Sequence, residues 1–397
     1  MKSLIQDEIK SYRDEILDFT KALVAIPTEN PPGRAYSQCV ELIAQELREL
    51  GVSSKVVKIT SGEFPRYGIL GFYGQAKRTL YFHGHYDVVP AANQQQFRPF
   101  VRGDRLFGRG SSDMKSGLAA MIYAIKALKE CHIDLNGRIG LTIVPDEETG
   151  GVLGSQYLAH KDLLGKNGIG MLTPEPTGGT IWNASRGAIS IRLTVKGKPA
   201  HVGLHYQGVN AFEKMLSVAN ILLKLKKKVE NRKTRFNIYP DAARRSVLLV
   251  GGRCEGGTNF NLVPGECSFT VDRRINPEEE LRSERQKFAA LFDRLRARGI
   301  NLKHEILQEG RSARISEREP LAQTLRESVL AITGRAPRFE MCPGLLEIRF
   351  YIERGIPALA YGPGLLKVSH GPNEFVRISD VVRCATVYAL TATRMLG

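Results

Sequence analysis

Residues 81–90, YFHGHYDVVP, form an apolar segment that carries two histidines and an aspartate at alternate positions. Side chains alternate between the two faces of a strand, so His83, His85 and Asp87 are expected on one face. A buried polar group without a partner is costly, and three such groups in one strand need an explanation. The segment alone allows two interpretations: a His–Asp hydrogen bond that satisfies itself, or part of a functional site.

The first part of the chain alternates helical and strand patterns. Apolar residues at helical spacing predict an N-terminal helix, and further helices are expected at about 35–50 and 115–129. Short apolar segments that predict strands lie at 52–59, 68–73, 79–83 and 138–145. Strands mixed with helices indicate an α/β architecture.

The pattern changes near residue 185. The stretch ISIRLTVKG alternates apolar and polar residues as a half-exposed strand does, and long helical patterns lie at 210–229 and 278–297. This is typical of an α+β unit in which one sheet face packs on two helices. With 397 residues, the chain is long enough for two domains. We predict a catalytic domain (1–184 and 298–397) that is interrupted by an inserted domain (185–297).

Composition and charge limit the class of protein. The N-terminus has no continuous apolar region of the kind a signal peptide needs, and no run reaches transmembrane length. Six scattered cysteines without a CxxC pair fit reduced thiols, so a cytoplasmic protein is expected. The net charge is +16, partly in KLKKKVENRKTR at 224–235, which fits a solvated helix end or attraction of anionic substrates. No nucleic-acid-binding motif is present, and neither nucleic acid nor membrane is expected as a partner.

Polar residues follow several apolar segments. Four stretches contribute them: GRGSSDMKSG with Asp113, VPDEETGG with Asp146, Glu147 and Glu148, LTPEPTGG with Glu175, and YGPGLLKVSHGPNEF with His370 and Glu374. Each stretch alone could be a solvated or rigid turn. In open α/β sheets, however, ligands bind at the carboxyl ends of the strands, so these residues are expected to converge on one cleft.

The chemistry of this set favours metal-dependent hydrolysis. Histidines with several carboxylates suit zinc, manganese or cobalt, and the surplus of carboxylates indicates two ions held roughly 3.5 to 4 Å apart by a bridging ligand. No GxSxG elbow is present, and no cysteine has an obvious partner histidine nearby in the sequence. A serine or cysteine nucleophile therefore lacks support.

Taken together, the motifs resemble the dinuclear zinc amidohydrolase and exopeptidase family of acetylornithine deacetylase, succinyl-diaminopimelate desuccinylase, aminoacylase and glutamate carboxypeptidase. The matching blocks run in order along nearly the whole chain: GHYDVVP, GRGSSDMKSG, DEETGG, PEPT, PAHVG, NLVP with DRR, and YGPG followed by SHGPNE. The resemblance implies an α/β catalytic domain with a mixed, zinc-exopeptidase-like sheet. It also implies an inserted α+β lid or dimerisation domain with a four-stranded sheet and two helices.

The resemblance also assigns the site residues. It implies that one metal is held by His85, Asp113 and Glu175, and the other by Asp113, Glu148 and His370. Asp87 would fix the ring of His85, a role that metal-bound histidines commonly require. Glu147 would be the general base, taking a proton from a water between the metals and returning it to the leaving amine. His83 matches no functional position and is expected to be structural.

The inserted domain supplies the remaining expected residues. The resemblance implies that His201 stabilises the oxyanion from across a dimer and that Asn261 and Arg274 contact a substrate carboxylate. His205 and Arg273 are rivals by proximity. The family often has a cis peptide after the bridging aspartate, which here would be Asp113–Met114.

Two departures concern substrate contacts. The text is Ser185-Arg186-Gly187 where the desuccinylase branch has two arginines before the glycine. Glu347 in LLEIRF takes the place of the usual Thr-Asp or Ser-Asp. The acyl group therefore stays open. We predict a homodimeric hydrolase that cleaves the amide of a small N-acyl amino acid, with two Zn, Co or Mn ions. A dipeptidase or carboxypeptidase of the same family is the alternative.

Overall fold

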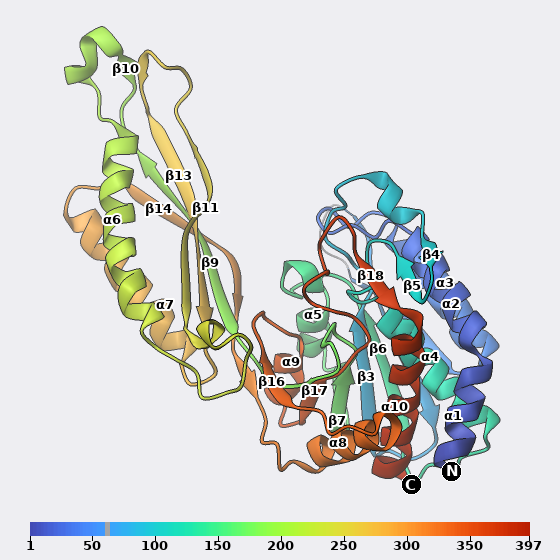
Figure 1. Cartoon of the computed structure of the whole chain (residues 1–397). Coiled ribbons are helices and arrows are strands. Elements are labelled where there is room, and N and C mark those ends of the chain that lie inside the picture. The colour runs from blue at the N-terminus through green and yellow to red at the C-terminus, as the bar shows by residue number, and fades with distance from the viewer. Residues whose placement is uncertain (60–63) are drawn as a thin grey trace. The chain divides into compact units, whose positions relative to one another are not determined.

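The protein is described by a computed structural model that covers residues 1–59 and 64–397. The chain divides into two compact units. Unit 1 comprises Met1–Asn183, Ile315–Glu340 and Glu347–Gly397, and unit 2 comprises Ala184–Arg314 and Met341–Leu346. After the insertion, the C-terminal part of the chain therefore completes the unit that the N-terminal part began (Figure 1).

A mixed nine-stranded sheet has the order β1-β2-β6-β3-β7-β17-β8-β15, and β16 pairs with β8. Strands β3, β6, β7 and β17 are parallel to their neighbours within this group, whereas β1 and β2 run antiparallel at one edge. The predicted mixed sheet is confirmed. Its strands are β1 (Ser53–Ile59), β2 (Arg66–Gly74), β3 (Thr79–His85), β6 (Arg138–Val144), β7 (Gly168–Thr173), β8 (Ile181–Ser185), β15 (Ala313–Arg314), β16 (Phe339–Cys342) and β17 (Ala358–Ala360).

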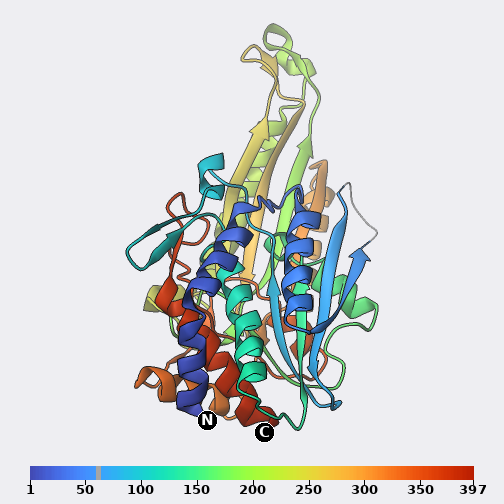
Figure 2. The ribbon, with the colours of Figure 1, turned by 90° about the vertical axis from the view of Figure 1, so that its right-hand side faces the viewer.

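Helices cover both faces of the sheet in unit 1. Figure 1 shows α5 and α9 on the opposite side of the strands from α4 and α10, and Figure 2 shows α1 to α4 and α10 in front of the sheet. The helices are α1 (Lys2–Ser11), α2 (Arg13–Ala25), α3 (Tyr36–Glu49), α4 (Lys115–Glu130), α5 (Ser155–His160), α8 (Pro320–Thr333), α9 (Ile348–Ile352) and α10 (Ile378–Leu396).

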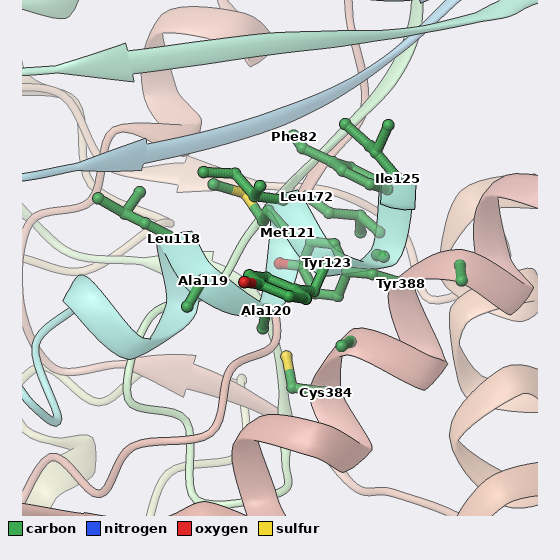
Figure 3. Packing of buried hydrophobic residues seen from close by; sticks show 14 of the residues in the cluster. Phe82, Leu118, Ala119, Ala120, Met121, Tyr123, Ile125, Leu172, Cys384 and Tyr388 are labelled. Carbon is green, nitrogen blue, oxygen red and sulfur yellow. The ribbon is translucent and has the colours of Figure 1, made fainter. Parts of the chain in front are cut away.

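The main core lies between α4, α10 and the central strands. Figure 3 shows α4 between the strands that carry Phe82 and Leu172 and helix α10, which carries Cys384 and Tyr388. The rings of Phe82 and Tyr388 meet edge to face with centroids 4.8 Å apart. Helix α4 is apolar nearly all round because it is buried on both sides.

The N-terminal helical pattern forms two helices rather than the single one predicted, with the break at Tyr12. The apolar residues at helical spacing are nevertheless buried as predicted: Ile5, Ile9, Tyr12, Ile16, Phe19 and Leu23. No helix in the described residues is long and apolar enough to cross a membrane.

Unit 2 is an α+β structure with an antiparallel sheet in the order β11-β13-β9-β14. Its strands are β9 (Gly187–Lys196), β11 (Val247–Gly256), β13 (Glu266–Ile275) and β14 (Leu302–Gly310), and its helices are α6 (Ala211–Glu230) and α7 (Leu281–Ala297). Buried residues alternate along β9 and β13 and face the two helices. The predicted four-stranded sheet with two helices is confirmed.

The predicted end of the insertion at 297 differs from the structure. Strand β14 pairs with β9 throughout and belongs to unit 2, which continues to Arg314. The strand LKHEILQEG lies at the sheet edge and is mostly exposed, so its polar sequence gives little sign of its place in the sheet.

Two small sheets complete the structure. Strands β4 (Phe100–Arg102), β5 (Arg105–Phe107) and β18 (Phe375–Arg377) form one sheet in the order β18-β5-β4. Strands β10 (Ala200–His201) and β12 (Leu262–Val263) form the other. Each sheet brings together segments that lie far apart in the sequence.

Close packing of α4 on the segment after β7 gives the first testable prediction. A Cβ atom at Gly117 would lie 2.6 Å from Pro174 Cβ and 2.7 Å from the Pro174 carbonyl oxygen, which is less than contact distance. We expect Gly117→Ala to lower the free energy of unfolding by about 1–3 kcal/mol through overpacking, although alanine favours helix. Denaturant titration of both proteins measures this change.

Gly344→Ala is the control for this substitution, because its new Cβ would meet only ordinary contacts at 3.6 Å. Equal stability of the Gly117→Ala variant and the native protein would contradict the packing argument.

Candidate active site

Three parallel strands of unit 1 end at the same edge of the sheet, and polar residues follow each of them. Strand β3 ends at His85, the short 3-10 helix η2 (Glu147–Thr149) follows β6, and Glu175 follows β7. The register pairs His85 with Val144, so the ends of β3 and β6 are level. The structure thus brings together at one sheet edge the residues that the sequence placed at strand ends.

Asp113 lies between two histidines. Its Oδ1 is 3.5 Å from His85 Nε2, and its Oδ2 is 3.5 Å from His370 Nε2. Each carboxylate oxygen therefore faces a different ring, as expected for a carboxylate that bridges two cations. The peptide bond that follows, Asp113–Met114, is cis as predicted.

Glu148 completes the cluster. Its Oε2 is 3.2 Å from His370 Nε2, and ligand atoms of His85, Asp113 and Glu148 all lie within 4.8 Å of one another. The predicted ligand sets divide these three residues between two ions, with Asp113 shared. Glu175 is buried at the end of β7, where the charges of Asp113 and Glu148 act on it.

The donor atoms of this cluster fit divalent metal ions. In the described residues, His85 Nε2 and Glu148 Oε1 are buried and have no hydrogen-bond partner. A buried imidazole nitrogen and a buried carboxylate oxygen that both lack a hydrogen-bond partner are suited to bind a cation, because both atoms can donate a lone pair to it. Two histidines and three carboxylates also form a hard to borderline ligand set.

The electrostatics support the same interpretation. Burial raises the pKa of Glu148, and burial together with Asp113 raises that of Glu175 to about 8. Asp113 is the exception: despite its burial, the neighbouring imidazoles of His370 and His85 hold its pKa below the usual range. Burial and mutual repulsion therefore disfavour the charged forms of Glu148 and Glu175, whereas the imidazoles beside Asp113 stabilise its charged form.

Glu147 lies next to these residues and shares their environment. Its Oε2 is 3.9 Å from His85 Nε2. Burial, with the charges of Glu175, Glu148 and Glu347, raises its pKa well above the usual range, although His85 opposes the shift. Because η2 has already left the strand, Glu147 and its neighbour Glu148 both reach the cluster.

Asp87 contacts the ring of His85, as predicted, and does so chiefly through its backbone carbonyl. The Nδ1 of His85 is 3.0 Å from the backbone carbonyl of Asp87 and 3.4 Å from its Oδ1. The carbonyl can only accept, so Nδ1 carries the proton and Nε2 is free to face Asp113. The carboxylate also accepts the backbone N–H groups of Glu147 and Glu148, both at 3.2 Å.

Asn30 is a positioning residue that the sequence did not reveal. Its Nδ2 donates to Asp87 Oδ2 at 2.8 Å, and it also lies 3.3 Å from Asp146 Oδ1 and 3.0 Å from Thr149 Oγ1. The amide therefore separates two buried carboxylates that would otherwise repel each other. In the sequence, Asn30 is part of a Pro/Gly loop and carries no spacing signal.

His83 has structural contacts, as expected. Its Nε2 is 2.8 Å from Glu347 Oε2, and Tyr351 Oη and Ser155 Oγ lie 3.3 Å from the ring nitrogens. All of these side chains are buried. His83 thus shares a strand with His85 but points into a separate network.

The predicted residues of unit 2 fall into two places. His201 is exposed in β10, and the backbone carbonyl of Asn261 accepts the N–H of the next residue, Val202, at 3.0 Å. Arg274 lies in the four-stranded sheet, near the end of β13 that is far from Glu266, opposite Val247 and Ala188. The residues of β13 between Glu266 and Arg274 span roughly 27 Å at the usual rise of a strand.

The surroundings of Arg274, Arg273 and His205 differ in what they leave available to a ligand. Arg274 is held by Asp272 through its Nε at 2.7 Å and one Nη at 3.0 Å. Arg273 is buried in ion pairs with Glu279 and Glu284, at 2.6 and 3.0 Å, so its role is structural. His205 is exposed in a short 3-10 helix beside β10.

Comparison with known proteins gives consistent matches. The model of peptidase family M20/M25/M40 matches residues 81–394. The chain is 28% identical over 372 residues to succinyl-diaminopimelate desuccinylase from Nitrosomonas eutropha, covering 90% of this chain and 93% of that protein.

A second relative and a solved structure extend the comparison. The chain is 25% identical over 403 residues to N-formyl-4-amino-5-aminomethyl-2-methylpyrimidine deformylase from Bacillus subtilis, covering 95% and 94% of the two chains. Human carnosine dipeptidase 1 superposes with a TM-score of 0.79 at 17% identity, over 100% of this chain and 99% of that chain. This structural likeness shows the shared fold.

Metal uptake should release protons. In the metal-free chain, hydrogen bonds to Asp113 and Glu148 raise the pKa of His370 to about 11, so the ring is protonated at neutral pH. A metal ligand must be neutral imidazole, so binding of Zn²⁺ to metal-free protein near neutral pH should release protons, and its affinity should rise with pH. Calorimetry in two buffers of different ionisation enthalpy counts the protons released. The His370→Ala variant should release fewer protons on binding Zn²⁺. An unchanged number of protons would contradict the prediction that His370 is a metal ligand.

Proposed function

The chain belongs to peptidase family M20/M25/M40, and from this premise we propose that it is a metal-dependent hydrolase that cleaves the amide bond of an N-acyl amino acid. The observation that carries the proposal is Asp113 between His85 and His370, with Glu148 and Glu147 beside them. The relatives named as a desuccinylase and a deformylase act on acyl groups, which supports a deacylase.

We propose two divalent ions, most simply zinc, with cobalt or manganese as alternatives. His85, Asp113 and Glu175 would hold one ion, and Asp113, Glu148 and His370 the other. When bound, such ions polarise an amide carbonyl and lower the pKa of water. The set of imidazoles and carboxylates supports zinc but does not require it.

Glu147 is the proposed general base. Its carboxylate lies beside His85 but has no described hydrogen bond to it, so an oxygen is available to take a proton from water. Burial and neighbouring carboxylates favour its protonated form, which helps it to hold that proton and then donate it to the leaving amine. The backbone contacts of Asp87 hold the loop in place during both transfers.

We propose that His201 donates to the oxyanion of the transition state. Its Nδ1 accepts the N–H of Gly203 at 3.1 Å, so in the neutral ring Nε2 carries the proton. The ring is exposed, which leaves this N–H available to a ligand. Asn261 lies beside it and is proposed to contact a substrate carboxylate, while Asp272 leaves one Nη of Arg274 for the same purpose.

A homodimer through the inserted domain would reconcile these positions. His201 lies in β10, whose partner β12 precedes the start of β13, whereas Arg274 lies near the far end of β13. Residues from two chains therefore offer the simplest way for both kinds of contact to reach one substrate. Unit 2 also exposes several large apolar side chains near β10 and along α6, as an unpaired interface would. They are Val202, Leu204, Tyr206, Val209, Phe212, Leu216 and Leu223.

The remaining proposals concern the surroundings of the enzyme. We propose a cytoplasmic protein, since all six cysteines are free thiols. The net charge of +16 supports a small anionic substrate and a favourable field for its approach. Neither nucleic acid nor membrane is a proposed partner.

A substrate panel tests the proposed activity. Metal-free protein and protein restored with Zn²⁺, Co²⁺ or Mn²⁺ would be assayed with N-acetyl, N-formyl and N-succinyl amino acids and with the matching dipeptides. We expect metal-dependent hydrolysis of at least one acyl series. Preference for dipeptides would establish the peptidase alternative, and metal-independent activity would contradict the mechanism.

Replacing the proposed base should separate chemistry from metal binding. Glu147→Ala removes a carboxylate that is outside both ligand sets, so bound metal should stay near the native amount. Turnover should fall by roughly 100-fold or more, because general acid–base catalysis contributes about that factor. Elemental analysis and steady-state kinetics measure the two quantities. Near-native turnover would show that another group is the base.

Subunit mixing tests whether His201 acts across a dimer. Glu147→Ala and His201→Ala chains should each be nearly inactive, and His201→Ala should keep its metal. After unfolding and refolding together, a heterodimer has one site with both native residues. Roughly a quarter of native activity per chain should then return if pairing is random. No recovery despite heterodimer formation would place His201 in its own chain's site.

A further inference from the structure

His370 is the least supported histidine of the cluster. Its side chain is 49% exposed, whereas that of His85 is 1% exposed and stands on the central strand β3. His370 lies in the loop before β18, and its backbone adopts a left-handed conformation with φ 64°, which is uncommon for any residue other than glycine. Packing of the ring alone therefore cannot fix its position, and the backbone must be held by other groups.

Arg109 holds the backbone of His370 through hydrogen bonds. It is only 2% exposed, and one Nη donates to the carbonyl of His370 at 3.1 Å. The other Nη approaches the carbonyl of Gly371 at 3.4 Å and forms an ion pair with Glu374 Oε2 at 2.6 Å. The planar guanidinium thus holds the backbone at His370 and at the residue that follows it.

Glu374 holds the other ligand segment. Its Oε1 accepts the backbone N–H of Ser112 at 2.9 Å and that of Asp113 at 3.1 Å. The N–H of Gly108 donates to the carbonyl of Glu374 at 3.1 Å, where β5 and β18 are paired. One carboxylate therefore links the backbone of Asp113 to Arg109, and through it to the backbone of His370.

We infer that Arg109 and Glu374 form a positioning pair that sets the distance between Asp113 and His370. The two members lie 265 positions apart in the sequence, and each contacts the backbone of the segment that carries a proposed ligand. This inference rests on the metal centre of the proposed function. It assigns a role to two buried charged residues that belong to neither proposed ligand set.

A purely structural role is the competing explanation. Removing one member of a buried ion pair commonly destabilises a protein whether or not a site is near. Unit 2 contains a matched pair for comparison. Glu284 is 4% exposed and pairs with buried Arg273 at 3.0 Å, and its described ion pairs all lie in unit 2.

The experiment compares Glu374→Gln with Glu284→Gln by metal binding. Metal-free full-length protein would be titrated with Zn²⁺ against a chromophoric chelator, and thermal unfolding of each metal-free variant would be recorded alongside. Both variants should lose thermal stability. Only Glu374→Gln should weaken binding of one of the two ions, by roughly 10- to 100-fold, as is typical when a partner of a metal ligand is removed. Arg109→Lys keeps the charge but not the planar fork, and should weaken the same ion.

The effect must also depend on the ring that the pair positions. In a His370→Ala background the weaker ion has already lost a ligand, so adding Glu374→Gln should change its affinity much less than in the native background. Native affinity for both ions in Glu374→Gln and Arg109→Lys would overturn the inference. So would equal weakening by Glu284→Gln. If native protein itself binds no Zn²⁺, the proposed metal centre fails first.

Discussion

Mutual repulsion among buried carboxylates is the constraint on which this structure depends. Asp113, Glu148 and Glu175 gather at the ends of parallel strands, where burial penalises their charge. The fold offers them two imidazoles, and Asp113 turns one oxygen toward each. His85 Nε2 and Glu148 Oε1 are nevertheless buried without a hydrogen-bond partner, so the described side chains do not satisfy every polar atom of the cluster. A pair of divalent cations would complete it, so the same repulsion that strains the apoprotein becomes metal affinity.

Main-chain groups, more than side chains, control the geometry of the cluster. The carbonyl of Asp87 sets the tautomer of His85, and its carboxylate receives the N–H groups of the loop that carries Glu147 and Glu148. A single residue next to the end of β3 therefore orients one proposed ligand, His85, and holds the backbone of the proposed base, Glu147, and the proposed ligand, Glu148, after β6. Asn30 then neutralises the contact between this carboxylate and Asp146 without adding charge. Backbone contacts of this kind tolerate little movement, which suits the different roles proposed for the two adjacent glutamates.

Much of the fold and the cluster could be predicted, and the failures have physical reasons. Helices α3, α4, α6 and α7 and strands β1, β2, β3 and β6 follow hydrophobic patterns that extend over a whole element. The end of the insertion was missed because β14 is an exposed edge strand with few apolar residues. The clustering of His85, Glu147, Glu148 and Glu175 could be predicted because the ends of parallel strands meet at one sheet edge. Asn30 could not, since its contacts join segments 57 and 116 positions away.

His83 and Glu347, for which the family resemblance gives no catalytic or metal-binding role, contact each other in the structure. His83 stands on the central strand beside a proposed ligand, and Glu347 takes a place where the resemblance implies a shorter acid. Their side chains meet at 2.8 Å, both buried. The other oxygen of Glu347 lies so close to Gly151 that any side chain there would collide, and Arg349 donates to the carbonyl of Gly150 at 2.7 Å. The longer side chain of Glu347 can thus support the loop that carries Glu147 and Glu148, provided that His83 on β3 holds the Glu347 carboxylate in place. The loop is then fixed from two sides, by Asp87 at its start and by Glu347 and Arg349 at its end.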